Sequence, residues 1–136
     1  MSLGAVVVNV DGGARGNPGP AAIAAVVHDS EGRLLAERHE LIGEATNNVA
    51  EYRALLLGIA TASELAASEV ELVGDSELIV RQVQGAYRVK DPNLRELNAR
   101  VREALRNFGS WSIRHVRREQ NAHADRLVNE TLDASA

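Results

Sequence analysis

The stretch VNVDGGARGNPGPAA, residues 8–22, sets the start of the fold because it separates two apolar runs. Residues 5–10 form a β-rich run that ends at a single carboxylate, Asp11, and residues 21–28 form a second apolar run. Between them stand four glycines and two prolines, residue types that favour tight turns over continued strands. We therefore expect two strands joined by a loop that begins at Asp11.

Outward from this stretch, the pattern predicts a mixed sheet. A turn at residues 29–32 leads to a third strand over residues 34–41. Further along, we expect a helix over 46–65, a strand at 70–73, helices at 76–84 and 93–108, a fifth strand at 111–116 and a last helix over 121–132. The predicted fold class is α/β: an antiparallel meander of strands 1–3, extended by parallel strands 4 and 5 and flanked by helices.

Composition narrows the class of protein. The 136 residues fit a single domain over 1–136, and 45% hydrophobic with 25% charged residues is typical of a globular chain. Because the sequence has no Cys, disulfides, zinc knuckles and thiol catalysis are excluded. The longest apolar run, residues 21–27, is too short to cross a bilayer, and residues 1–10 have no basic segment typical of a signal peptide. We expect a cytoplasmic, monomeric protein without a membrane partner.

Charge is unevenly distributed along the chain. The net charge is −4, but residues 1–80 carry 4 Arg against 12 Asp or Glu, and residues 81–136 carry 11 Lys or Arg against 7 Asp or Glu. This split allows an acidic half that holds cations beside a basic half that holds a polyanion. The basic residues are equally consistent with a solvated helix face.

Four acids stand where the predicted strands end or the helices begin. Each has an ordinary structural explanation: Asp11 as a turn residue, Glu51 in capping-box spacing, Asp75 as a helix N-cap and Asp125 in the first turn of the last helix. Together, however, they are expected to converge at one edge of the sheet, beyond the carboxyl ends of the parallel strands.

Converging carboxylates repel one another and stay ionised only with cations among them. Ligation by oxygen alone selects hard ions, Mg²⁺ first and Mn²⁺ as a substitute. Two such ions suit the hydrolysis of a phosphodiester. The residues alone therefore predict nuclease chemistry.

Four blocks of sequence carry a resemblance to a known family. DGGARGNPGPAA at 11–22, TNNVAEYRALLLG at 46–58, GDSELIVRQVQG at 74–85 and HVRREQNAHADRLVNE at 115–130 resemble the signature blocks of type 1 ribonuclease H, in order and spacing. The resemblance implies endonucleolytic cutting of the RNA strand of RNA/DNA hybrids by a two-metal-ion mechanism, with 5′-phosphate and 3′-hydroxyl ends. It also implies that Asp11, Glu51, Asp75 and Asp125 bind the metal ions.

The same resemblance implies the residues that hold the hybrid. Main-chain groups at Gly12 and Gly13 are expected to approach the RNA, since neither residue has a Cβ. Contacts to the 2′-hydroxyl must decide which strand is cut. The remaining expected contacts are Arg15, Asn17, Thr46, Asn47 and Asn48, for which loop and cap chemistry is the alternative explanation.

The chain departs from the family pattern in three places. Relatives often carry a His in a mobile loop before the last Asp; here we expect Arg118 in that role, with Arg117, His115 and His123 as alternatives. Glu77 stands where many relatives have Gln. The segment 84–93 is short, with Arg88 and Lys90 as its cations, so we expect weaker and more salt-sensitive binding of hybrid.

Other functions remain open from the sequence. A related nuclease acting on DNA or structured RNA, a non-catalytic nucleic-acid-binding module, and a cation-binding or interaction domain each fit part of the pattern. The segment is also compatible with the N-terminal part of a longer chain that carries a phosphatase domain.

Overall fold

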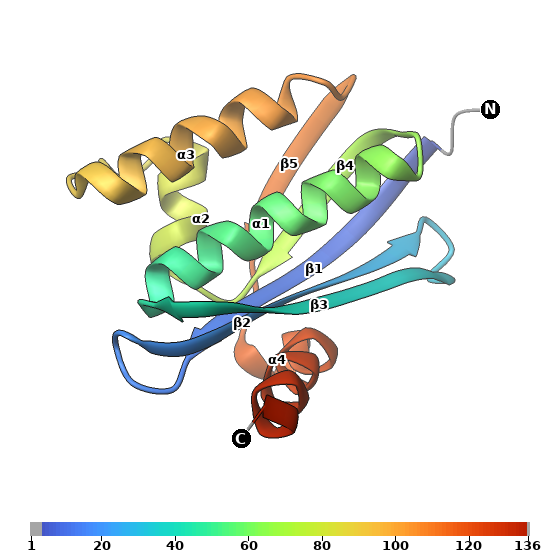
Figure 1. The fold of residues 1–136 in the computed structure, drawn as a ribbon. Coiled ribbons are helices and arrows are strands. Elements are labelled where there is room, and N and C mark those ends of the chain that lie inside the picture. The colour runs from blue at the N-terminus through green and yellow to red at the C-terminus, as the bar shows by residue number, and fades with distance from the viewer. Residues whose placement is uncertain (1–3, 136) are drawn as a thin grey trace.

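A computed structural model describes residues 4–135, which form one mixed sheet with helices on both faces (Figure 1). The elements, in chain order, are β1 (Gly4–Ala14), β2 (Gly19–Asp29), β3 (Leu34–Ala45), α1 (Asn47–Glu64), β4 (Ala67–Gly74), α2 (Glu77–Gln84), α3 (Pro92–Leu105), β5 (Ser110–His115), a 3₁₀ turn η1 (Arg118–Asn121) and α4 (Ala122–Ser135).

The sheet has the strand order β3-β2-β1-β4-β5. β1 pairs antiparallel with β2, and β2 antiparallel with β3, whereas β1 with β4 and β4 with β5 are parallel pairs. The predicted fold class is confirmed: an antiparallel meander is extended by two parallel strands. The end of β4 consequently lies beside the middle of β1, next to Asn9 and the residues that follow it.

Helices cover the two faces unequally. α1, α2 and α3 lie on one face and α4 lies alone on the other (Figure 1). β2 is buried on both faces, which explains its nearly continuous apolar sequence. Its alternate residues Ala21, Ile23, Ala25 and Val27 join the main core under α1, while Ala22, Ala24 and Val26 join a smaller cluster under α4.

β1 differs from its predicted boundary. The strand does not stop at Asp11; its ladder with β2 continues through Gly12 and Gly13 to the pair Ala14–Ala21. Gly12 is explained by close packing rather than by a turn, because a Cβ at this position would overlap the backbone of Ala50 on α1. The connecting loop is therefore shorter than the composition suggested.

Helix caps also differ from two predicted roles. Capping-box spacing would pair Glu51 with an N-cap at Asn48, but the N-cap of α1 is Thr46, whose hydroxyl accepts a hydrogen bond from Val49 N–H at 3.2 Å. Ser76, not Asp75, is the N-cap of α2. Both corrections free the carboxylates of Glu51 and Asp75 from the capping roles that local spacing had suggested.

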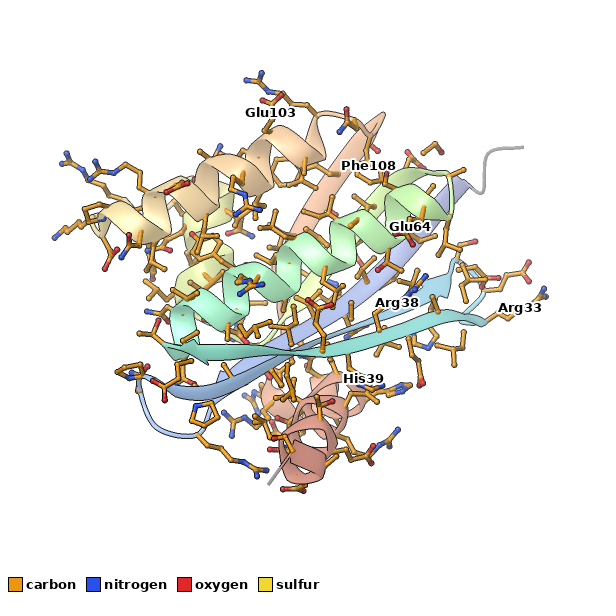
Figure 2. All side chains as sticks on the ribbon, in the orientation of Figure 1. Arg33, Arg38, His39, Glu64, Glu103 and Phe108 are labelled. Carbon is orange, nitrogen blue, oxygen red and sulfur yellow. The ribbon has the colours of Figure 1, made fainter. Side chains whose placement is uncertain are left out.

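Polar contacts tie the far end of α1 to the edge strand. Figure 2 shows Arg38 of β3 and Glu64 at the end of α1 near one another, and their side chains form an ion pair at 3.2 Å. Among the helices within residues 4–135, none combines the length and apolar character needed to cross a membrane.

Candidate active site

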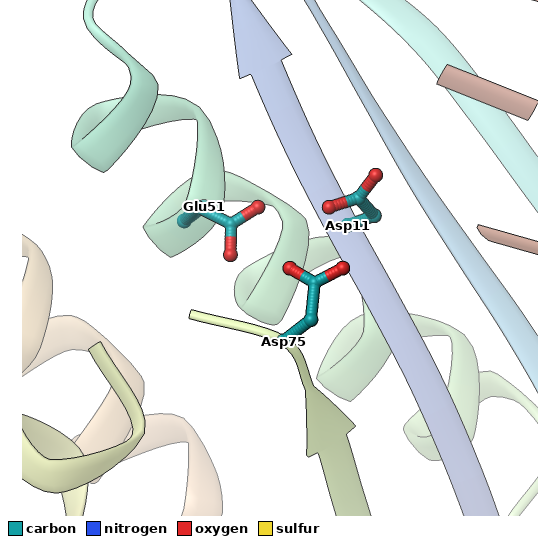
Figure 3. A group of neighbouring side chains, drawn as sticks. All are labelled: Asp11, Glu51 and Asp75. Atoms are coloured by element: carbon teal, nitrogen blue, oxygen red, sulfur yellow. The ribbon is translucent and has the colours of Figure 1, made fainter. Parts of the chain in front are cut away.

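Three carboxylates meet just beyond the point where the parallel pairing of β1 with β4 ends, at Asn9 and Val73. Asp11 lies on β1, Glu51 on α1 and Asp75 directly after β4, and one oxygen from each lies within 4.8 Å of the others. Figure 3 shows the three side chains pointing toward a common space. We call Asp11, Glu51 and Asp75 the acidic cluster.

Backbone packing fixes the position of Glu51. The Gly12 N–H donates a buried hydrogen bond of 2.6 Å to Oε1 of Glu51, which links β1 to the first turns of α1. This contact requires α1 to lie against the strand at Gly12, where a side chain would overlap Ala50. The absence of a Cβ at Gly12 thus brings Glu51 beside Asp11.

The pKa values of all three carboxyl groups in the acidic cluster are raised. Burial, reinforced by the charge of Asp75, raises the pKa of Asp11 to about 7. Burial and then the charge of Asp11 raise the pKa of Glu51 well above its usual range. Burial likewise raises the pKa of Asp75. Placing these desolvated, mutually repelling carboxylates together is unfavourable unless a proton or a cation lies between them.

The cluster fits a hard divalent cation. Oδ2 of Asp75 is buried and finds no hydrogen-bond partner among residues 4–135, although such buried oxygens are normally satisfied. All the donors are carboxylate oxygens, which suit Mg²⁺ or Mn²⁺. An ion bound at this point would satisfy the Asp75 oxygen and offset the repulsion in the cluster.

Asp125 stands apart from the other three acids. It lies in the first turn of α4 and is not part of the group within 4.8 Å. Its carboxylate nevertheless faces the same cleft, and its charge adds to the effects of burial and Asp75 that raise the pKa of Asp11. The structure therefore places Asp125 beside the acidic cluster, on a separate helix.

A cleft of about 470 Å³ surrounds these acids. Most of the residues expected to contact substrate line it: Gly12, Gly13, Arg15, Asn47, Asn48 and Arg118. Thr46 and Asn17 are not in the lining; both lie close behind it and hold the backbone. Thr46 caps α1, and Asn17 accepts a hydrogen bond from Asn47 N–H at 2.9 Å.

Asn47 and Arg15 already have partners within the protein. Oδ1 of Asn47 accepts a hydrogen bond from Ala14 N–H at 2.8 Å, which braces the end of β1 against the start of α1. Arg15 forms an ion pair with Asp133 of α4 at 2.6 Å. Each side chain therefore supports the wall of the cleft as well as lining it.

The four candidates for the loop role occupy different places. Arg118 begins η1, lines the cleft, and its charge acts with Asn121 against the effect of burial on the Asp75 pKa. His115 is the last residue of β5 and has a weaker effect of the same sign. Arg117 precedes η1, and His123 contacts Glu37 of β3 at 2.7 Å.

Sequence reasoning missed three residues near the site. Ser76 and Asn129 line the cleft, and Asn121 lies buried at the end of η1, just before α4. Ser76 was detectable as the residue next to Asp75 with cap chemistry. Asn121 gave no such signal, because it stands in a polar stretch where burial cannot be read from periodicity.

Known proteins are similar to this chain in sequence and in fold. A family profile described as "Reverse transcriptase-like" matches residues 9–131. The ribonuclease HI of Halobacterium salinarum is 46% identical over 130 residues, which cover 96% of this chain and 65% of that protein. Further relatives from Mycobacterium are 44% identical, and the chain covers 36% of their length. The chain thus spans about two thirds of one relative and about a third of the others.

Two solved structures are also similar. The crystal structure of RNase H1 from Halobacterium salinarum matches with a TM-score of 0.94 and 45% identity, covering 96% of this chain and 98% of that one. LC11-RNase H1, solved in complex with RNA/DNA hybrid, matches with a TM-score of 0.90 and 45% identity, again over 96% and 98% of the two chains.

Proposed function

The chain belongs to the type 1 ribonuclease H family, and from this premise we propose that it is an endoribonuclease acting on RNA/DNA hybrids. It would hydrolyse the RNA strand and leave 5′-phosphate and 3′-hydroxyl ends. The observation that carries the proposal is the acidic cluster: three carboxylates, from β1, α1 and the end of β4, with oxygens within 4.8 Å of one another. The similarity to an RNase H1 solved with hybrid supports the choice of substrate.

Asp11, Glu51 and Asp75 would hold Mg²⁺, with Mn²⁺ as a substitute, and Asp125 would complete the ligand set from α4. When bound, a pair of these ions supplies Lewis-acid chemistry, which activates water and neutralises charge on the departing oxygen. The chain's own contribution is to bring the carboxylates together before substrate arrives. The Gly12 hydrogen bond to Glu51 and the parallel pairing of β1 with β4 do this.

The cleft wall would hold the RNA strand beside the acidic cluster. Gly12 and Gly13 present backbone groups without side chains in front of them, and Asn48 is half-buried in the same wall. Contacts from this wall to 2′-hydroxyl groups would distinguish RNA from DNA. Arg15, Asn17, Thr46 and Asn47 would act mainly by holding this wall in shape, given their contacts within the protein.

Arg118 would oppose negative charge at the cleft. It is exposed, begins the turn before α4 and lies close enough to influence Asp75. We assign it, rather than His115, to the loop role that the family pattern gives to a His. We also expect the chain to act as a monomer in the cytoplasm and as one domain over residues 1–136.

The test is incubation of a 5′-labelled RNA/DNA hybrid with the protein and Mg²⁺, with a chelator as control. Cutting of the RNA strand alone, lost with chelator and in Asp75→Asn, is the expected result. Ligation of the products to a 3′-hydroxyl oligonucleotide would verify the 5′-phosphate. Equal cutting of double-stranded RNA or DNA would contradict the substrate assignment. Retention of hybrid without cutting, at saturating Mg²⁺ or Mn²⁺, would make the protein a binding module instead.

A further inference from the structure

One segment, residues 116–121, hydrogen-bonds the residues that directly precede Asp11 and Asp75. Val116 N–H donates a hydrogen bond of 3.0 Å to the carbonyl of Gly74, the residue before Asp75. Five residues later, Nδ2 of Asn121 donates a hydrogen bond of 2.8 Å to the carbonyl of Val10, the residue before Asp11. The same segment then begins α4.

Asn121 is the centre of this connection. Its side chain is buried, with an exposed fraction of 1%, and it both donates and accepts within the protein. Its Oδ1 accepts a hydrogen bond of 2.9 Å from Nδ2 of Asn9, so the amide is fixed from two successive residues of β1. The pairing of β1 with β4 ends at Asn9 and Val73, so Asn121 binds β1 just beyond that ladder.

The amide also lies next to the residues that carry the acidic cluster. It binds the carbonyl of Val10, which precedes Asp11, and its segment binds the carbonyl of Gly74, which precedes Asp75. Four residues after Asn121 comes Asp125, the acid that stands on α4 apart from the others. Asn121 therefore contacts the strand that carries Asp11 and leads directly into the helix that carries Asp125.

We propose that Asn121 is a positioning residue whose buried amide sets the spacing between Asp125 on α4 and the acidic cluster on the sheet. This inference rests on the proposed function, because the spacing matters only if these acids share bound ions. Mg²⁺ demands near-ideal octahedral geometry, so a small displacement of one carboxylate weakens its binding. Removal of a group that orients metal ligands typically costs about ten- to a hundredfold in affinity or activity.

The experiment compares wild type with Asn121→Ala, Asn9→Ala and a matched control, Asn98→Ala. Asn98 is a buried asparagine on α3 that hydrogen-bonds Tyr52 Oη at 3.1 Å and accepts from Arg102 at 3.2 Å, on the opposite face of the sheet from α4. Its loss removes a similar amount of buried hydrogen bonding. Mn²⁺ binding is measured by electron paramagnetic resonance without nucleic acid, and hybrid cleavage is measured across a range of Mg²⁺ concentrations.

We expect Asn121→Ala to raise the Kd for Mn²⁺ by about tenfold and to lower kcat, with the KM for hybrid within about twofold of wild type. Raising Mg²⁺ should restore part of the kcat. Asn9→Ala should change Mn²⁺ binding in the same direction by about threefold, because it releases only one side of the Asn121 amide. Asn98→Ala should lower the Tm while leaving the Kd for Mn²⁺ within about twofold.

Two results would overturn the inference: a Kd for Mn²⁺ in Asn121→Ala that equals the wild-type value, or an equal shift in Asn98→Ala. If Asn121→Ala does not fold, Asn9→Ala decides between the same outcomes. If wild type binds Mn²⁺ and cuts hybrid, and Asn121→Ala does both equally well, the positioning role of Asn121 is wrong but the proposed function stands. A wild-type protein that binds no ion and cuts no hybrid defeats the proposed function and this inference together.

Discussion

The backbone N–H of Gly12 lies 2.6 Å from Oε1 of Glu51 and donates a buried hydrogen bond to it across the junction of β1 and α1. A carboxylate that would otherwise be desolvated next to Asp11 thus receives a donor from the strand itself. The contact exists because residue 12 has no side chain between the strand and the helix.

Replacing Gly12 with Ala should therefore disturb both stability and the site. The added Cβ would overlap the backbone of Ala50, so α1 must move away, at a cost of about 2 kcal/mol or more in the free energy of unfolding. Gly13→Ala is the matched control, because its Cβ would meet only Val128 Cγ1 at an ordinary 3.7 Å. Urea denaturation measures both variants, and equal stability of the two would contradict the packing argument.

Asp11→Asn should stabilise the metal-free protein near neutral pH. The pKa of Asp11 is about 7 in the fold against 3.8 as its ordinary value, so the folded state binds the proton more tightly. Stability contributed by that proton is present below pH 4 and is lost as the pH rises to about 7. The neutral amide avoids this loss, which is on the order of 4 kcal/mol in the free energy of unfolding.

Thermal denaturation in chelator at about pH 8 and about pH 5 checks this prediction. The Tm of Asp11→Asn should exceed that of wild type at the higher pH, and the difference should shrink at the lower pH, where Asp11 is protonated. A variant less stable than wild type at both values would show that the carboxylate is not under electrostatic strain.

Divalent ions should stabilise the protein increasingly as the pH rises through about 7. Below that value a proton occupies Asp11 and competes with the ion for the same oxygens, whereas above it the competition disappears. The increase in Tm on adding Mg²⁺ should therefore be larger above about pH 7 than below it, and hybrid cleavage should rise across the same pH range. Asp75→Asn should show little Mg²⁺-dependent shift at any pH; a shift equal to wild type would remove Asp75 from the ligand set.

Arg118→Ala should slow hybrid cleavage by about tenfold, well short of the loss in Asp75→Asn, because it removes one charge at the cleft but no metal ligand. Arg117→Ala and His115→Ala serve as comparisons under the same Mg²⁺ concentration. Circular dichroism confirms that each variant is folded. Greater damage from His115→Ala would transfer the loop role to the histidine at the end of β5.

Much of the fold could be predicted because apolar periodicity and strand order constrain it. Alternation and turn residues indicated the five strands, and the topology implied that residues following β1 and β4 meet. The extent of β1 could not be predicted, since Gly12 and Gly13 look like loop residues until the approach of α1 is known. Local spacing also could not show that Glu51 accepts from Gly12 rather than from its own helix.

The acids of the candidate site could be predicted from the sequence, but the distances between them could not. Side chains at strand ends are easily found, but the distance between Asp125 and the acidic cluster depends on how α4 docks, which no local pattern encodes. Asn121 illustrates the same limit: an asparagine in a run of polar residues looks solvent-exposed, yet tertiary contacts with Asn9 and Val10 bury it.

The apolar cluster under α4 is much smaller than the main core on the opposite face of the sheet. Only seven buried side chains hold α4 to β2, whereas the opposite face shares the main core with three helices. Undocking α4 exposes this small cluster and leaves the main core under α1 intact, so the amides of α4 should exchange with deuterium before those of α1. An undocked α4 would carry Asp125 away from Asp11, Glu51 and Asp75, so local opening of this one helix changes the distance between the fourth acid and the acidic cluster.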